Sequence, residues 1–163
     1  MSYDYKFVGG QNNEFVFETD YSVVYLIQFK DSNYLFSLEN VHISEQVFEF
    51  VIEVAYKPTT EKIPLDPKIE TTVALIFKDF FERNENRVIV YICESADNKQ
   101  LQRMKKFDIW FNKYHDVSLL KIDEILEDSN KNKFPISLIL KNNHPHLHQI
   151  IDAFIALTRL GEK

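Results

Sequence analysis

A basic and aromatic stripe on a predicted helix is the feature of this sequence best suited to binding a ligand. On a helical projection of residues 98–114, five side chains fall within a sector about 80° wide: Lys99, Arg103, Lys106, Trp110 and Lys113. Cations beside an aromatic ring can hold an anion and stack a planar group. The stripe therefore predicts a binding site for an anionic protein or a nucleic acid. A solvated helix face with its lysines paired to glutamates is the alternative.

The single cysteine offers a possible nucleophile. Cys93 ends a predicted strand, and Asp97 and Arg103 follow where the next helix begins. A helix N-terminus favours the thiolate and so lowers a thiol pKa, which makes a small hydrolase or nuclease-like site conceivable. A phosphatase-type loop would need arginine where this chain has Lys99, together with glycines that the segment lacks. A buried cysteine in a central strand explains the pattern more simply.

A histidine cluster near the C-terminus suggests a weak metal site. His144, His148 and Asp152 are spaced i, i+4 and i+8, and two histidines with a carboxylate form a ligand set that zinc accepts. Pro145, however, favours the first helical turn, so His144 would precede the helix and point elsewhere. We therefore predict neither a resident metal nor any other cofactor.

Two carboxylates on a long predicted strand are the remaining candidates for chemistry. Glu49 and Glu53 lie on one face of a strand predicted for residues 47–57, among apolar neighbours. A carboxylate pair can perform acid–base catalysis, whereas the wet side of a sheet carries the same residues without a function. No serine in the chain has the glycine frame of a nucleophile elbow.

The elements that would position these residues follow from hydrophobic periodicity. Period-2 alternation and turn signals predict strands at residues 15–19, 22–29, 34–38, 47–57 and 134–141. Residues 87–93 are nearly apolar on both sides, which predicts a central strand that is covered on both faces or crossed by neighbours. Asp66 and Pro67 supply an N-cap and a first helical residue, so a helix begins there and ends at residues 84–86. A last helix starts within residues 142–145 and runs to Gly161. Residues 118–126 remain ambiguous between strand and helix.

This order of elements predicts an α+β fold in a single domain, residues 1–163. Runs of consecutive strands followed by a mixed half favour a mainly antiparallel sheet of about six or seven strands, with three helices packed on one face. The other face would carry apolar residues that need cover, namely Val16, Val24, Leu26, Val47, Val51 and Ile139. We therefore expect a homodimer through the open sheet face or a sheet edge, unless residues 118–126 pack there.

Composition narrows the function mainly by exclusion. Of 163 residues, 45% are hydrophobic and only three are glycine, so the chain is neither disordered nor equipped with a glycine-rich phosphate loop. A net charge of −6 argues against a protein that coats nucleic acids regardless of their sequence. The single cysteine excludes an internal disulfide. The chain lacks a signal peptide and a membrane-spanning apolar run, so we expect a cytoplasmic protein.

One motif runs from the predicted strand 87–93 into the following helix and continues where the last helix begins. Its residues are Tyr91, Cys93, Ser95, Asp97, Arg103, Lys106, Phe107, Trp110, Phe111, Asn143, His144 and Pro145. The motif resembles that of a family of small single-domain bacterial proteins with no assigned function. The resemblance implies one free-standing domain and carries no activity, cofactor or catalytic residue.

Taken together, the residues favour a non-enzymatic binding or regulatory module over an enzyme. In this interpretation, the helix 98–114 presents its basic and aromatic stripe to an anionic partner. The alternative is a small hydrolase or nuclease-like effector that would use Cys93, Asp97 and Arg103, or the pair Glu49 and Glu53.

Overall fold

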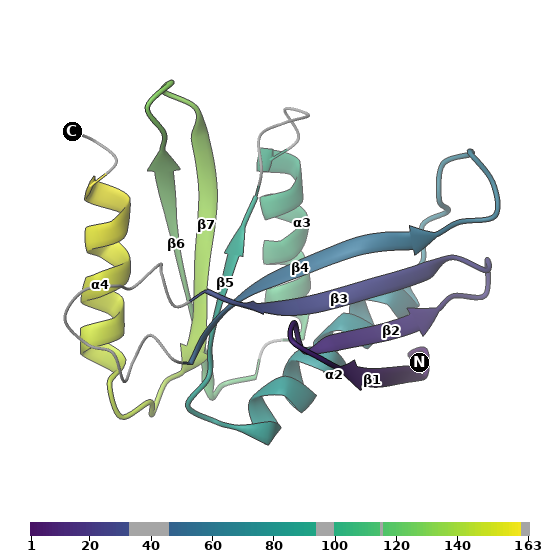
Figure 1. Ribbon diagram of the computed structural model, residues 1–163, viewed down its shortest axis with the longest axis horizontal. Helices are drawn as coiled ribbons and strands as arrows, with labels where there is room; N and C mark the ends of the chain where they lie inside the picture. The colour runs from purple at the N-terminus through teal and green to yellow at the C-terminus, as the bar shows by residue number, and fades with distance from the viewer. Residues whose placement is uncertain (33–45, 94–99, 115, 161–163) are drawn as a thin grey trace. The chain divides into compact units, whose positions relative to one another are not determined.

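The computed structural model describes residues 1–32, 46–93, 100–114 and 116–160 (Figure 1). Within these ranges the elements are β1 (Tyr5–Gly9), β2 (Glu14–Glu18), β3 (Val24–Asp31), β4 (Val47–Tyr56), α2 (Pro67–Arg83), β5 (Val88–Ile92), α3 (Gln100–Lys113), β6 (Leu119–Glu127), β7 (Lys133–Lys141) and α4 (Leu147–Leu160). In this part of the chain, no helix is long and apolar enough to cross a membrane.

The strands form one mixed, mostly antiparallel sheet in the order β1-β2-β3-β4-β5-β7-β6. Strands β4 and β5 pair in parallel, whereas β1 with β2, β2 with β3, β5 with β7 and β6 with β7 pair antiparallel. The predicted α+β class and strand number are thus confirmed. By internal contacts the chain divides into two compact units, residues 1–30 with 50–84 and residues 31–49 with 85–163.

The first unit is held together by aromatic rings under α2. Asp66 caps this helix, its side chain accepting a hydrogen bond from the Lys68 backbone N–H, and Pro67 begins it as predicted. One stripe of the helix is buried because it faces the strands. The ring of Phe80 stacks on Phe29 at 3.9 Å between centroids, and Phe77 contacts Phe50 at 4.8 Å. Burial of such large rings stabilises this unit.

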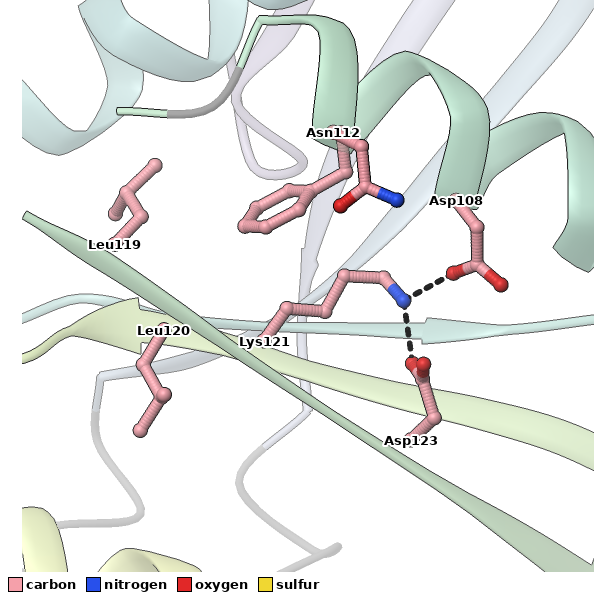
Figure 2. A pocket seen from close by; sticks show the side chains of 7 residues that line it. Asp108, Asn112, Leu119, Leu120, Lys121 and Asp123 are labelled. Carbon is pink, nitrogen blue, oxygen red and sulfur yellow. Dashed lines mark hydrogen bonds and ion pairs between the residues drawn. The ribbon is translucent and has the colours of Figure 1, made fainter. Parts of the chain in front are cut away.

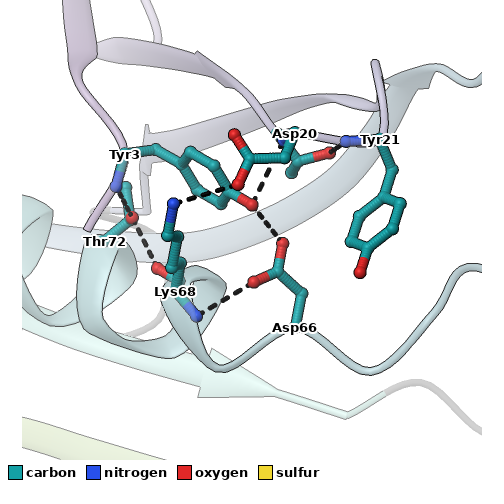
Figure 3. A network of polar contacts seen from close by, with 7 residues as sticks. Tyr3, Asp20, Tyr21, Asp66, Lys68 and Thr72 are labelled. Carbon is teal, nitrogen blue, oxygen red and sulfur yellow. Dashed lines mark hydrogen bonds and ion pairs between the residues drawn. The ribbon is translucent and has the colours of Figure 1, made fainter. Parts of the chain in front are cut away.

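A polar network holds the chain start against the beginning of α2 (Figure 3). The Tyr3 hydroxyl donates to an Asp66 carboxylate oxygen and accepts from the Asp20 backbone N–H at 3.2 Å. The Tyr3 backbone N–H donates to the Thr72 hydroxyl at 2.8 Å. Lys68 completes the network through an ion pair with Asp20 at 2.9 Å. Asp66 therefore serves two purposes, as helix cap and as acceptor for Tyr3.

This network predicts a loss of stability in alkaline solution. Burial, opposed by the Asp20 N–H and reinforced by the bond to Asp66, raises the pKa of Tyr3 from 10.0 to about 12. Because the folded state holds this proton more tightly than the unfolded chain, the contribution to stability is complete below pH 10 and is lost as the pH rises to about 12.

We expect Tyr3→Phe to lower the free energy of unfolding by about 1.5–3 kcal/mol at neutral pH, the usual effect of losing a hydrogen bond to a charged group. The variant should also show a smaller decline in stability between pH 10 and 12, measured by urea denaturation. Tyr21→Phe is the control, because Tyr21 is half exposed. Equal pH profiles for the wild-type protein and Tyr3→Phe would contradict this assignment.

The second unit has a helix on each face of its strands. On one face, α4 buries Ile150 and Phe154 against Val90 and Leu138. On the other face, α3 lies against the strand residues next in sequence to these, Tyr91 and Ser137. The Ser137 hydroxyl contacts the Met104 sulfur at 3.3 Å, and the centroids of the Tyr91 and Phe107 rings lie 4.5 Å apart. Successive strand residues point to opposite faces, so α3 and α4 cover opposite sides.

This arrangement corrects the expectation that all three helices pack on one face. The reason is physical: β5 and β7 are apolar on both sides, as a strand with a helix on each face requires. Two of the six residues predicted for the open face, Val47 and Ile139, are fully buried. The other four, Val16, Val24, Leu26 and Val51, are partly exposed.

Several boundaries differ from the sequence prediction. The ambiguous segment 118–126 is strand β6, and the first strand, β1, was not predicted. Helix α4 begins at Leu147, two residues after Pro145. The strand predicted at residues 34–38 lies outside the described residues.

Candidate functional site

Helix α3 carries the predicted site and has a buried side and an exposed side. Met104 and Phe107 are buried beneath it. The opposite side is in solvent, where Leu101 is 69% and Ile109 57% exposed. Lys105, Lys106 and Lys113 are exposed on the same side. The prediction of one continuous helix with an apolar and a cationic flank is thus confirmed for residues 100–113.

The predicted stripe lies partly on this exposed side and partly at its border. The Lys106 ammonium lies over the Trp110 ring at 5.1 Å from its centroid, and the indole is half-buried. Lys113 lies over the Tyr114 ring at 5.4 Å. Arg103 is exposed. Burial raises the pKa of Tyr91 and the pKa of Cys93, and the positive charge of Arg103 opposes both shifts. Lys99 lies outside the described residues.

The acidic residue of α3 points away from the exposed lysines. Asp108 forms an ion pair with Lys121 of β6, and Lys121 also contacts Asp123 at 2.6 Å (Figure 2). The Lys121 side chain is only 8% exposed and its ammonium lies 5.9 Å from the centroids of the Phe107 and Phe111 rings. Asp108 is thereby neutralised within the molecule.

An open pocket of about 460 Å³ surrounds this ion-pair cluster. It is lined by Asp108, Phe111, Asn112, Leu119, Leu120, Lys121 and Asp123. Ser137 of β7 lies behind it and donates a hydrogen bond to Asp123 at 2.6 Å. Ser137 is fully buried, so its hydroxyl holds Asp123 in place rather than facing a substrate.

Sequence reasoning did not identify the cluster of Asp108, Lys121, Asp123 and Ser137. Two signals were present. Lys121 and Asp123 alternate with apolar residues on residues 119–126, and Ser137 is the one hydroxyl in the apolar run from Phe134 to Leu140. Neither signal could be used before residues 118–126 were known to form a strand beside β7.

Cys93 has the environment of a structural thiol. It is 1% exposed, and burial raises its pKa above 9.0 despite the opposing effects of Tyr91 and Arg103. A nucleophilic cysteine needs an accessible thiolate, which is the opposite arrangement. Asp97 lies outside the described residues, so the proposed group of Cys93, Asp97 and Arg103 gains no support from the geometry.

His144 has a structural role at the start of α4. Its Nδ1 accepts a hydrogen bond from the His146 backbone N–H at 3.0 Å, so Nε2 carries the proton and donates to the Asn86 carbonyl at 2.8 Å. Both ring nitrogens are therefore engaged, whereas His148 and Asp152 are exposed on the helix. No group of three metal-binding side chains occurs in the residues described.

The pair Glu49 and Glu53 is poorly placed for joint catalysis. Glu49 is half-buried and Glu53 exposed on β4. They are four positions apart on the strand, roughly 13 Å at the usual rise per residue. Carboxylate pairs in glycosidases lie about 5–9.5 Å apart, so this alternative also lacks geometric support.

Comparison with known proteins gives one match. The model of the family of unknown function DUF6169 matches residues 65–156, which is more than half of the 163-residue chain. The chain belongs to this family. The match to DUF6169 confirms the resemblance to a family without assigned function and includes α3 with the ion-pair cluster behind it. No curated protein and no solved structure matches the chain.

Proposed function

We propose that this member of DUF6169 is a binding module whose α3 surface holds an acidic segment of another protein. The α3 surface consists of Leu101, Lys105, Lys106, Ile109, Trp110 and Lys113. The observation that supports the proposal is the direction of Asp108, the one acidic residue of α3, whose carboxylate is held by Lys121 behind the helix. The exposed side of α3 therefore carries lysines, and no acidic side chain of the helix itself lies among them.

The apolar residues of the α3 surface favour a protein over a nucleic acid. Leu101 and Ile109 are each more than half exposed between the lysines, and protein interfaces bury such side chains at their centres. The indole of Trp110 adds a half-buried aromatic ring of the kind that often dominates binding energy. Nucleic-acid sites depend instead on phosphate contacts and basic stripes, and the chain as a whole carries a net charge of −6.

Charge would supply much of the specificity of this surface. Exposed ion pairs contribute little each, roughly 0.2–1 kcal/mol, and salt screens them over about 10 Å at 0.1 M. Several lysines acting together attract an acidic segment and increase its association rate. The affinity for an acidic segment should therefore fall as the salt concentration rises, while the contribution of the apolar contacts to binding remains.

The single tryptophan allows this proposal to be tested without a label. Trp110 belongs to the α3 surface and the chain has no other tryptophan, so its fluorescence reports on a ligand bound there. The probe is a synthetic amphipathic peptide with glutamates and leucines on one helical face. We expect saturable changes in Trp110 emission with this peptide, and little change with the same peptide carrying glutamine in place of glutamate.

We expect Lys105→Glu with Lys106→Glu to weaken binding of the acidic peptide at least tenfold, which corresponds to about 1.4 kcal/mol. Lys62→Glu with Lys78→Glu is the matched control, because both lysines are exposed, neither belongs to the α3 surface, and the change in net charge is the same. The control should bind within about twofold of the wild-type protein, since rim and remote charges act weakly.

Three outcomes would contradict the proposal. One is equal weakening in both double variants, which would indicate an effect of net charge alone. Another is tighter binding of a single-stranded oligonucleotide than of the acidic peptide. The third is equal affinity for the glutamate and glutamine peptides.

A further inference from the structure

The two edge strands of the sheet differ in how they are protected from pairing with another strand. Strand β1 has five residues, and its register with β2 shifts between Phe7 and Gly9, which has φ +79°. The Arg83 guanidinium also lies 4.0 Å from the centroid of the Phe7 ring. Short length, a bulge and a nearby charge are devices that discourage edge-to-edge pairing.

Strand β6 is neither short nor bulged, although it carries the charged residues Lys121, Asp123, Glu124 and Glu127. Its nine residues pair with β7 one to one, from Leu119 opposite Lys141 to Glu127 opposite Lys133, without a register shift. The strand contains neither glycine nor proline. Ile125, near its C-terminal end, is 54% exposed. A long, regular edge of this kind is a template for a further strand.

The hydrogen-bond pattern shows which backbone groups of β6 point outward. The Asn142 N–H donates to the Ser118 carbonyl at 2.8 Å, so even-numbered residues of β6 bond to β7. The odd-numbered residues Lys121, Asp123 and Ile125 therefore direct their N–H and C=O groups away from β7. No strand pairs with this side of β6 in the part of the chain that the structure describes.

We propose that β6 pairs antiparallel with β6 of a second copy of this chain, about a twofold axis that passes beside Ile122. In this register Lys121 faces Asp123 of the second copy, and Leu119 faces its Ile125. Ile122 faces its own counterpart. Opposite charges and apolar pairs placed directly across two strands stabilise their pairing, and the symmetry provides each favourable pair twice.

Charge selects this register over its neighbours. A twofold axis normal to the sheet pairs odd residues with odd residues, so allowed registers move the axis by one residue along the strand. With the axis at Lys121, that lysine would face itself, and with the axis at Asp123, that carboxylate would face itself. Like charges directly opposite destabilise a strand pair. With the axis at Glu124, Glu124 would face itself as well.

The charge cluster behind α3 fits this pairing. Lys121 already lies between Asp108 and Asp123, and the Asp123 side chain is 49% exposed. In the pair, the two lysines and the four carboxylates of both copies would form one continuous network across the axis. Because the axis is normal to the sheet, the two α3 surfaces would lie on the same face. The pairing does not depend on the proposed binding function.

Analytical ultracentrifugation of the whole protein tests the pairing directly. We expect a dimer of twice the 19.4 kDa chain mass. Ile125→Pro should be monomeric, because it removes an outward N–H without removing a bond to β7. Ile125→Lys should raise the dimer dissociation constant at least tenfold, since an edge lysine discourages pairing. Circular dichroism establishes whether each variant is folded, so Ile125→Lys suffices if Ile125→Pro does not fold.

Ile109→Lys is the control, because Ile109 has nearly the same exposure, 57% against 54% for Ile125, but lies on α3. It should remain dimeric. A wild-type protein that is monomeric up to millimolar concentration would overturn the proposal. Equal dissociation constants for Ile125→Lys and Ile109→Lys would overturn it as well.

Disulfide trapping tests the register. In the proposed pair Ile122 faces its counterpart at a non-hydrogen-bonded position, where Cβ atoms are about 4.5–5.5 Å apart and a disulfide can form. Ile122→Cys should therefore become a covalent dimer under mild oxidation. Glu124→Cys, which faces Leu120 of the second copy, should not. Faster cross-linking of Glu124→Cys than of Ile122→Cys would exclude this register, and equal failure of both would exclude the pairing.

Discussion

Phe80→Ala is expected to lower the free energy of unfolding by about 3–5 kcal/mol, the usual cost of deleting a fully buried phenylalanine. Phe80 is completely buried, and its ring stacks on Phe29 at 3.9 Å. The substitution removes the buried apolar surface and leaves a cavity between α2 and β3 that this rigid aromatic cluster cannot easily fill. Urea denaturation followed by circular dichroism measures the change.

Leu75→Ala on the same helix is the control for Phe80→Ala. Leu75 is 39% exposed, so its truncation should cost less than about 1 kcal/mol. Similar losses of stability in the two variants would show that the aromatic cluster does not hold α2 in place. A total stability of about 5–15 kcal/mol, typical of proteins, leaves Phe80→Ala measurable at low temperature.

Lys121→Met is expected to lower the free energy of unfolding by about 2–3 kcal/mol. Removing one member of a buried charge cluster usually costs about 3–5 kcal/mol, because the remaining charges stay without compensation. The effect should be smaller here, since the side chains of Asp108 and Asp123 are 37% and 49% exposed. Methionine preserves the apolar stem of Lys121 beside Phe107 and Phe111, so the change isolates the ammonium.

Lys68→Met is the matched control for Lys121→Met. Lys68 also forms an ion pair, with Asp20 at 2.9 Å, but both side chains are more exposed, 32% and 67%. Such a surface pair contributes about 0–1 kcal/mol. Adding Asp108→Asn to Lys121→Met should restore part of the lost stability by removing one uncompensated carboxylate. A Lys121→Met variant no less stable than Lys68→Met would contradict the assigned role of Lys121.

Hydrophobic patterns in the sequence correctly predicted the helices and strands whose buried residues recur at one regular spacing. Helix α2 begins at its Asp66 cap, and its apolar stripe from Ile69 to Phe80 is buried as the 3.6-residue period requires. Strand β7 is predicted from its sequence, but its residues from Pro135 to Leu140 are buried on both faces, because a helix covers each side of it. The prediction that all three helices pack on one face was wrong for this reason. A strand with apolar residues on both faces does not show which helix covers which face of the sheet.

The candidate site could be predicted from the sequence only where its residues belong to a single helix or strand. The amphipathic character of α3 follows from its own sequence, so its exposed lysines were found. The cluster of Lys121 with Asp108 and Asp123 joins residues from a helix and a strand, and its formation depends on tertiary packing. Likewise, the Nε2 hydrogen bond of His144 is made to the carbonyl of Asn86, 58 residues earlier. No local spacing indicates such long-range partners, which is why histidine spacing alone suggested a metal.

The most direct test of the account is a titration of ¹⁵N-labelled protein with the acidic amphipathic peptide, followed by backbone amide NMR. We expect chemical-shift changes centred on Leu101, Lys105, Ile109 and Lys113, together with the Trp110 indole N–H, and we expect these changes to be lost in the double variant Lys105→Glu with Lys106→Glu. Shift changes centred on another element, such as α4, or none at saturating peptide and low salt, would contradict this expectation.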